Sequence, residues 1–305
     1  MFEIFQTGVV FIIVLSFLVF IHELGHFAVA KFLGIGVEEF GFGLPPRAFG
    51  IKRGETIYSL NWLPIGGFVR LTGEDQADQG LGTRGQGSEK LKRYFWARSK
   101  KERSAVLLAG VAMNFTLAVV IISYIFTQGV LVPTGQVKIQ GVIPGSPAER
   151  AGLVIGDTIT RVNEVAVSDP KDVGQIVGEN KGKEVTLQIA RSGEDQERII
   201  TVTPRVEYPA HEGPLGVAIS NLVEKKYAWY EAPYKGLVEA LRMSGMLLAN
   251  LGMIVWKLVS FQGLKGVDVA GPIGIAQVTG QAIGYGFQAV LELMGLLSLN
   301  LAIVN

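Results

Sequence analysis

The residues from Ile4 to about Leu33 form a long apolar run that contains a cluster of ionisable side chains. An α-helix rises about 1.5 Å per residue, so about 20 residues cross the hydrocarbon core of a bilayer. The run is long enough to cross. It lacks the basic segment before it and the small-residue cleavage site after it that mark a secretory signal peptide. We therefore predict a retained transmembrane helix over residues 1–34.

A second apolar run, Ala105–Phe126, contains no charged residue, and we predict a second transmembrane helix at 104–127. The whole chain is only 18% charged, below the roughly 25% of soluble domains, which also indicates a membrane protein. Basic residues crowd the flank before this helix: Lys90, Lys92, Arg93, Arg98, Lys100, Lys101 and Arg103. Because basic flanks stay on the cytoplasmic side, residues 35–103 are predicted to be cytoplasmic.

Residues 135–222 change character, because short β-branched runs alternate there with turn residues. This pattern predicts a small β-rich domain inserted between membrane helices. The charge argument places the domain on the extracytoplasmic side. Its strands are expected at Val137–Ile143, Thr158–Val162, Glu184–Ala190, Ile199–Val202 and Leu215–Ser220, with one helix at Lys171–Gly178.

Further helical segments follow the β-rich domain, and we assign residues 228–286 to amphipathic or interfacial helices. Within them, Tyr234–Phe261 fits either a crossing or a helix lying in the interface. Residues 287–305 are predicted to begin a third core transmembrane helix. The sequence ends inside this apolar run without a cap, a stop residue or a flanking charge. We therefore expect the chain to be truncated within that helix.

The ionisable cluster of the first helix reads His22-Glu23-Leu24-Gly25-His26. Two histidines four residues apart share one helix face, so both imidazoles can reach one zinc ion. Glu23 lies beside them and can act as a general base toward water. The pattern also arises by chance in soluble proteins, but ionisable groups in a lipid-embedded helix are functional by default. We predict that His22 and His26 bind Zn2+ and that Glu23 is catalytic.

A catalytic zinc ion needs a third protein ligand, and the sequence offers few. It contains no cysteine and only three histidines. The third, His211, falls in the β-rich domain and is expected to be an exposed loop residue. Glu292 in the last apolar segment is an alternative. The favoured explanation is a ligand beyond Asn305.

A set of motifs follows one another along the chain: HELGH at 22–26, Phe40–Gly43 followed by Pro45, Leu63–Arg70, Gly271–Ala276 and Ser298–Asn305. Together they resemble the site-2 protease family of intramembrane zinc metalloproteases, most closely the bacterial regulator-of-sigma-E type with a PDZ domain. The resemblance covers essentially the whole chain. One departure is that Val111 stands where the family's Gly-Pro-x-x-Asn pattern has proline.

The resemblance implies a polytopic α-helical membrane protein with a re-entrant β-hairpin and an inserted PDZ domain. It also implies that the third zinc ligand is an Asp, here expected beyond Asn305. Asn114 lies in the middle of the second helix, where an amide can hold a neighbouring helix. By resemblance, it can instead bind the substrate carbonyl or its oxyanion. Asn300 and Asn305 allow the same two interpretations.

The glycine-containing segment Phe40, Gly41, Phe42 and Gly43 is assigned to substrate binding as well. A helical peptide bond is protected by its own hydrogen bonds, so a protease in lipid needs its substrate unwound. A free strand edge in this segment could pair with the extended chain. The alternative is an ordinary cytoplasmic turn.

The β-rich domain contains Ser146–Leu153 and a later loop of Gly213, Pro214, Leu215, Gly216 and Val217. This combination resembles a circularly permuted bacterial PDZ domain, whose carboxylate-binding loop comes last. A peptide terminus could bind there, between Leu215–Ser220 and the helix at Lys171–Gly178. The alternative is that the groove binds no peptide and acts as a size filter over the active site.

The sequence therefore predicts an intramembrane zinc metalloendopeptidase (EC 3.4.24.-) of the bacterial inner membrane. Its expected partners are the lipid bilayer and membrane-anchored substrates with a transmembrane segment, such as anti-sigma factors or signal-peptide remnants in regulated intramembrane proteolysis. Nucleic acid is not expected, because the net charge is only +1. The alternatives are an inactive membrane-anchored PDZ scaffold and a transporter-like channel.

Overall fold

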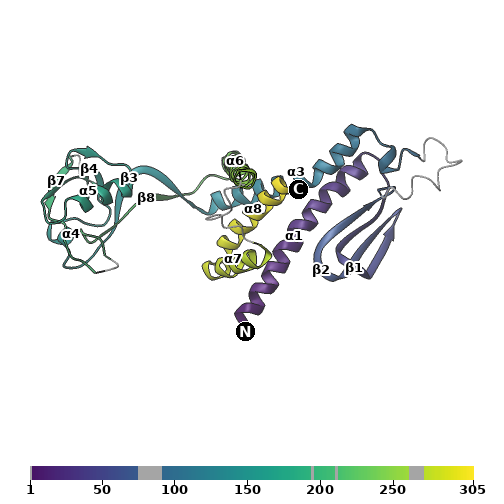
Figure 1. Ribbon diagram of the computed structural model, residues 1–305, viewed down its shortest axis with the longest axis horizontal. Helices are drawn as coiled ribbons and strands as arrows, with labels where there is room; N and C mark the ends of the chain where they lie inside the picture. The colour runs from purple at the N-terminus through teal and green to yellow at the C-terminus, as the bar shows by residue number, and fades with distance from the viewer. Residues whose placement is uncertain (1, 75–90, 194–195, 210–211, 261–270) are drawn as a thin grey trace. The chain divides into compact units, whose positions relative to one another are not determined.

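The computed structural model describes residues 2–74, 91–193, 196–209, 212–260 and 271–305. The chain divides into two compact units, shown in Figure 1. Unit 1 comprises Met1–Gln128 with Tyr227–Asn305, and unit 2 comprises Gly129–Lys226. The sequence predicts a flexible connection at Glu74–Glu89, which is rich in Gly, Gln and Asp, and almost all of this stretch lies outside the described residues, as does His211.

Unit 1 is built from α-helices and one β-hairpin. Its helices are α1 (Phe2–Phe32), α3 (Lys100–Gln128), α6 (Ala232–Val259), α7 (Pro272–Tyr285) and α8 (Phe287–Val304). Among the described residues, four of them (α1, α3, α6 and α8) are long and apolar enough to cross a membrane. This confirms the prediction of a multi-pass membrane protein. It also shows that α6, for which the sequence allowed either a crossing or an interfacial helix, is long and apolar enough to cross.

The helices approach one another where small residues face a neighbour. Gly25 of α1 lies directly against the backbone of Ala109 in α3, so that no Cβ would fit there. Gly236 of α6 lies in the same way against Ser123 of α3. Close packing of this kind holds membrane helices together, because lipid provides no hydrophobic force between them. The approach of α1 to α3 is what brings the site residues of both helices together.

The hairpin consists of β1 (Val37–Arg53) and β2 (Thr56–Leu71), and both strands fold back on themselves. The first part of β1, residues 37–42, pairs with residues 67–71 of β2 on one side and with residues 57–60 on the other. Residues 56–60 of β2 pair in turn with residues 49–53 of β1. The hairpin is therefore four strand segments wide. Gly43 and Gly66, with φ of +80° and +73°, lie where the two strands bend.

The prediction that Phe40–Gly43 offers a free strand edge is wrong. Phe40, Gly41 and Phe42 each pair with β2 on both sides. The carbonyl of Gly43 accepts a hydrogen bond from the buried Asn61 amide at 2.9 Å. The sequence contained the two hairpin motifs but no signal for their fold-back, which places this segment inside the sheet.

The β2 bend is fixed to α1 by a buried serine. The Ser16 hydroxyl donates to the Pro64 carbonyl at 2.7 Å and accepts from the Gly66 N–H at 3.2 Å. Phe40 and Phe42 pack their rings on Phe20 of α1. These contacts hold the hairpin along the same helix that carries the HELGH motif.

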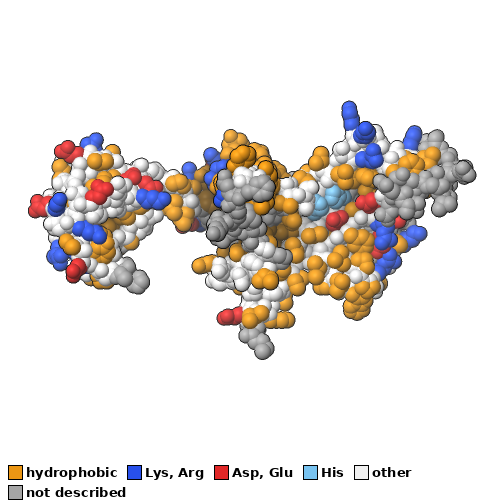
Figure 2. All heavy atoms as spheres, viewed as in Figure 1, with side chains coloured by type: hydrophobic (Ala, Val, Ile, Leu, Met, Phe, Trp, Pro, Cys, Tyr) orange, Lys and Arg blue, Asp and Glu red, His pale blue; other side chains and the backbone are white. Residues whose placement is uncertain are grey.

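The two ends of the hairpin differ in polarity. At the turn between the strands, Glu55 forms ion pairs with Lys31 and Arg93. Toward the bends, large apolar side chains are exposed, and Figure 2 shows hydrophobic groups gathered on this element. The exposed members are Leu44, Phe49, Ile51, Leu60, Trp62, Leu63 and Ile65.

Unit 2 is a β-sheet domain with its own core. Its strands are β3 (Val130–Val142), β4 (Thr158–Val162), β5 (Val165–Ala166), β6 (Val185–Ala190), β7 (Arg198–Val202) and β8 (Val217–Lys225), with helices α4 (Pro147–Arg150) and α5 (Pro170–Glu179). The sheet order is β7-β6-β4-β3-β8, with β5 paired to β4. The core is rich in fully buried Val, Ile and Leu, among them Val137, Ile159 and Leu187. Unit 2 extends beyond the predicted 135–222, because β3 and β8 continue as a pair from Val130↔Lys225 inward.

A buried ion pair stabilises this domain. Asp157 is fully buried, and its carboxylate accepts hydrogen bonds from Arg191 at 2.7 Å and from the Val154 N–H at 3.0 Å. Burial opposes ionisation of the carboxyl, but the hydrogen bonds and the charge of Arg191 outweigh it. The pKa of Asp157 therefore lies below its ordinary value.

We predict that Asp157→Asn destabilises unit 2 by about 1–3 kcal/mol at neutral pH, since Arg191 loses its charged acceptor. A depressed carboxyl pKa contributes stability above the unfolded value of about 3.9, and this contribution is lost as the pH falls through the folded value. Hydrogen exchange of the β4 and β6 amides in the whole protein measures both effects. Wild-type protection should fall on acidification through this range more steeply than that of the variant; parallel curves would contradict the assignment.

Candidate metal centre

The HELGH residues lie on α1, and their side chains converge. Among the described residues, His22, Glu23 and His26 are the group of potential ligands close enough to hold a metal ion, with ligand atoms all within 4.8 Å of one another. The two imidazole rings stand 4.8 Å apart between centroids and nearly perpendicular, at 79°. All three side chains are partly buried. The structure thus brings the predicted catalytic trio together.

His26 is oriented by a backbone carbonyl of α3. Its Nδ1 lies 2.7 Å from the carbonyl oxygen of Val106. A carbonyl only accepts, so the ring proton is on Nδ1 and the lone pair of Nε2 is free. An imidazole held in this way by a second partner is typical of a metal ligand.

His22 contacts the predicted residue Asn114. The Asn114 amide nitrogen lies 3.3 Å from His22 Nδ1. Asn114 is fully buried in α3, and the hydroxyl of Ser298 in α8 donates to its backbone carbonyl at 2.8 Å. The second helix therefore supplies one hydrogen-bonding partner to each histidine.

Glu23 points to the hairpin. Its Oε2 accepts a hydrogen bond from the Val69 N–H of β2 at 3.2 Å. The strand segment next to the Glu23 carboxylate is therefore residues 66–71 of β2, not residues 40–43 of β1. One oxygen of Glu23 is held by this bond while the carboxylate still borders the cavity described below.

Gly110 of α3 faces both imidazoles. A Cβ at this position would lie 2.5 Å from His26 Nε2 and 2.6 Å from His22 Nε2. The two Nε2 atoms thus converge on one small space that only glycine keeps open. Two imidazole nitrogens and a nearby carboxylate are the donor set that zinc takes in catalytic sites, so the residues present fit a zinc ion.

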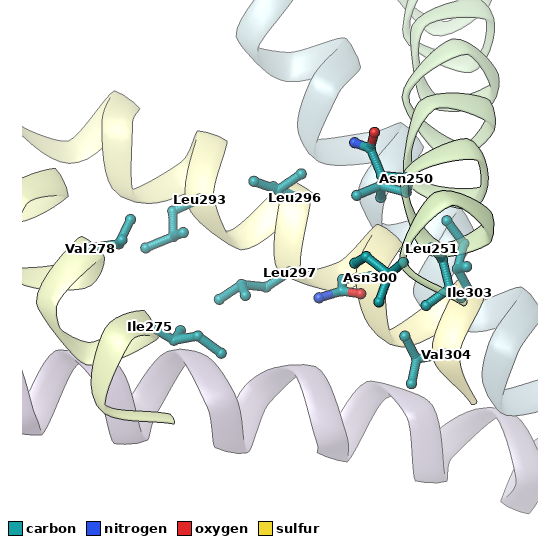
Figure 3. A pocket seen from close by; sticks show the side chains of 12 residues that line it. Asn250, Leu251, Ile275, Val278, Leu293, Leu296, Leu297, Asn300, Ile303 and Val304 are labelled. Atoms are coloured by element: carbon teal, nitrogen blue, oxygen red, sulfur yellow. The ribbon is translucent and has the colours of Figure 1, made fainter. Parts of the chain in front are cut away.

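The trio borders a cavity of about 580 Å³ lined by residues of α1, α3 and α8. Asn114 and Asn305 line it together with His22, Glu23 and His26. The predicted residue Asn300 does not: it lies with Asn250 in a largely apolar pocket of about 480 Å³ between α6, α7 and α8, shown in Figure 3. Glu292 is exposed and accepts a hydrogen bond from Gln288, away from the histidines, so it is not the third ligand in this arrangement.

Several residues of the centre were missed at the sequence level. The carbonyl of Val106 and the N–H of Val69 are backbone groups, which leave no mark in a residue pattern. Gly110 stood inside a recognisable motif, and its spacing of four residues from Asn114 could have placed it on the same helix face. Ser298, which bonds to the backbone of Asn114 outside the centre, could have been found only from the approach of α8 to α3.

The predicted PDZ loop lies in unit 2 next to the start of β8. Leu215 is buried, and its carbonyl accepts from the Ala148 N–H at 3.1 Å. Gly216 has φ of +74° and lies directly against Ser146. β8 is a terminal strand of the sheet and contacts α5. The loop, the strand and the helix expected around a groove are therefore neighbours.

Comparison with known proteins identifies a family and several relatives that this chain resembles. The model of "Peptidase family M50" matches residues 10–305. A zinc metalloprotease RasP of Shouchella clausii is 30% identical over 98% of this chain and 86% of its own length. RasP of Oceanobacillus iheyensis is 28% identical over the same shares of 98% and 86%. A Clostridium acetobutylicum protein, whose name also refers to a zinc metalloprotease, is 30% identical over 99% of this chain and 82% of its own length.

A solved PDZ domain of an SdrC-like protein from Listeria monocytogenes also matches, at 19% identity and a TM-score of 0.25, over 30% of this chain and 93% of that one.

Membrane-length helices around a histidine–glutamate centre define a multi-pass membrane metalloprotease. The chain belongs to peptidase family M50, the zinc-dependent site-2 protease family.

We predict that Gly110→Ala abolishes stoichiometric zinc binding, because the new methyl group occupies the space on which both Nε2 atoms converge. The imidazoles can rotate away from it, so the protein should still fold. Gly252→Ala is the matched control, since nothing lies within 4 Å of a Cβ at that helical position. Metal analysis of the purified full-length proteins, which include the third ligand predicted beyond Asn305, should give zinc in the control and not in Gly110→Ala; equal zinc in both would contradict the assigned metal position.

Proposed function

We propose that this protein is an intramembrane zinc metalloendopeptidase that cleaves transmembrane segments of membrane-anchored proteins. The observation that carries the proposal is the convergence of both Nε2 atoms on Gly110 with the Glu23 carboxylate beside them. The family match supports the metalloprotease class. A third zinc ligand, expected to be an Asp beyond Asn305, stays a prediction.

In this proposal His22 and His26 hold the metal, with the Val106 carbonyl and Asn114 behind them. Zinc, when bound, supplies Lewis-acid activation of water and of the substrate carbonyl. Glu23 acts as the general base that takes a proton from the attacking water and then passes it to the leaving amine. The Val69 N–H keeps its carboxylate aimed at the cavity.

The substrate would be bound from two sides of the cavity. Asn114 and Asn305 line it and are candidates to bind the substrate carbonyl or its oxyanion. Asn300 borders the separate apolar pocket of Figure 3 and would contact the substrate only outside the catalytic cavity. For Phe40–Gly43 we propose a supporting role, because this paired segment holds β2 against α1.

The hairpin is proposed to re-enter the membrane from the cytoplasmic side. Its turn is tied by Glu55 to Lys31, at the end of α1, and to Arg93 in the basic flank of α3. Its opposite end exposes apolar side chains such as Phe49 and Trp62. Non-helical backbone is tolerated at membrane depth only where protein covers it, and residues 39–42 and 57–60 satisfy that condition because they are paired on both sides.

Unit 2 is proposed to be an extracytoplasmic PDZ domain. The arrangement within unit 2 supports this proposal, because β8 is a terminal strand of the sheet beside α5 and follows the loop Gly213–Val217. A peptide could add to this edge, or the groove could limit the size of substrates that reach the cavity. In the bacterial inner membrane the enzyme would act in regulated intramembrane proteolysis, on substrates such as anti-sigma factors or signal-peptide remnants. The intact histidine–glutamate centre argues against an inactive scaffold.

We predict that Glu23→Gln keeps zinc and lowers cleavage of a model transmembrane substrate by at least about 100-fold, because the general base is lost while both imidazoles remain. Glu3→Gln, at the exposed start of the same helix, is the control and should cleave like wild type. Metal content and cleavage are measured on the same preparations. Normal cleavage by Glu23→Gln would refute the assigned base.

A second prediction concerns the hairpin, where Trp62 is 72% exposed. A variant that keeps Trp62 and replaces the other three of the four tryptophans with Phe should lose fluorescence in vesicles of brominated lipid, because Trp62 would sit among acyl chains. The matched variant that keeps only Trp96, beside Tyr94 near the basic flank, should be quenched less. Stronger quenching of Trp96 than of Trp62 would place the hairpin tip outside the membrane.

A further inference from the structure

The contact between His22 and Asn114 admits two hydrogen-bond arrangements with opposite consequences. A primary amide presents NH2 on one side and an oxygen on the other, and a half-turn exchanges them. If Nδ2 donates to His22 Nδ1 across the 3.3 Å contact, the ring proton must be on Nε2. If the oxygen occupies that position, it accepts from Nδ1–H, and the lone pair on Nε2 is free.

Only the second arrangement is compatible with a metal at His22 Nε2. That atom faces the same space beside Gly110 as His26 Nε2, so a proton on it would point at the ion. His26 already has the required tautomer, because the Val106 carbonyl at 2.7 Å can only accept. An equivalent acceptor is needed behind His22, and Asn114 is the side chain that contacts its Nδ1.

The Asn114 oxygen is available for this bond. Asn114 is fully buried, and its Oδ1 has no hydrogen-bond partner among the described residues. A buried acceptor without a partner is unfavourable, and a bond from His22 Nδ1–H satisfies it. The amide nitrogen then takes the buried position that the oxygen leaves.

The contact of α8 with α3 at this point does not use the amide. Ser298 donates to the backbone carbonyl of Asn114, and this bond survives any side chain at position 114. A role in holding α8 therefore does not explain why the buried side chain is an amide.

We propose that Asn114 is the positioning residue of His22: its amide oxygen accepts from Nδ1–H and thereby fixes the tautomer and ring orientation that zinc binding requires. This inference rests on the proposed function in one respect, namely that His22 is a zinc ligand. It assigns Asn114 a role through His22, which is separate from the direct substrate contact considered above.

The test compares zinc affinity, measured by competition with a chelator, for the full chain and three variants. Asn114→Asp keeps the acceptor in the same shape, and we expect its affinity to be within about threefold of wild type or tighter. Asn114→Leu keeps the bulk without the acceptor, and loss of an outer-shell partner typically weakens metal binding about 10- to 100-fold. Ser298→Ala removes the helix contact alone and should bind zinc like wild type.

A packing role predicts the opposite order, because a buried carboxylate would disturb the bundle more than leucine. Zinc binding that is weaker in Asn114→Asp than in Asn114→Leu would therefore overturn the proposal. Ser298→Ala as weak as Asn114→Leu would also overturn it. Failure of wild type to bind zinc, in a full-length protein that includes the third ligand predicted beyond Asn305, would instead refute the proposed function.

Proton NMR of the zinc-loaded protein with ¹⁵N-labelled histidine gives an independent readout, since there are only three histidines and His211→Gln removes one. The Nδ1–H protons of His22 and His26 should both be protected from exchange in wild type and in Asn114→Asp. In Asn114→Leu the His22 proton should lose protection, while that of His26 remains as an internal control. An unchanged His22 proton in Asn114→Leu would contradict the proposed bond.

Discussion

Helix α1 carries two imidazoles and a carboxylate in the middle of an apolar segment, and the rest of unit 1 is arranged to give each of them a partner. Ionisable groups at such a position are expensive unless they are paired. His26 contacts the Val106 carbonyl, His22 contacts the Asn114 amide, and Glu23 accepts a hydrogen bond from the Val69 N–H. Two of the three partners are backbone groups, so the site depends on where α3 and β2 lie.

That placement depends in turn on small residues. Gly25 lets the backbone of α3 come against α1 near Ala109, and Gly110 lies one residue further along. The same approach therefore brings the Val106 carbonyl within hydrogen-bonding distance of His26 and leaves a space where both Nε2 atoms meet. A larger side chain at either glycine would separate the helices or fill the site. The close approach of α1 and α3 at these two glycines is therefore required both for helix packing and for the geometry of the site.

The sequence predicted the elements that its periodicity encodes. The α1 and α3 segments were found because a long apolar run has few alternatives in a membrane protein, and strand β4 was placed at Thr158–Val162 as observed. The HELGH spacing also put both histidines on one helix face, and the structure brings them together. These features depend on local pattern alone.

The predictions that failed, and the site residues that were missed, depend on contacts between residues distant in the sequence. Phe40–Gly43 was interpreted as a free edge because its own composition is strand-like, whereas its actual partners, residues 57–60 and 67–71, are set by the bends at Gly43 and Gly66. Asn300 lies in α8 and Asn305 directly follows its last residue; at 3.6 residues per turn, a spacing of five places two side chains about 140° apart around the helix axis. They consequently border different cavities. Spacing alone identified them as a pair, but the helix geometry separates them.

The fold-back of the hairpin has a consequence for the proposed catalytic base. Because residues 40–42 are paired on both sides, the β-sheet segment that touches the Glu23 carboxylate is residues 66–71 of β2. This segment is also fixed by Ser16, which lies seven residues before Glu23 on α1 and bonds to Pro64 and Gly66. Seven residues are two helical turns, so both contacts lie along one face of α1. Any displacement of the hairpin relative to α1 must therefore move the Val69 N–H that bonds to Glu23, which couples the position of the hairpin to the orientation of the proposed catalytic base.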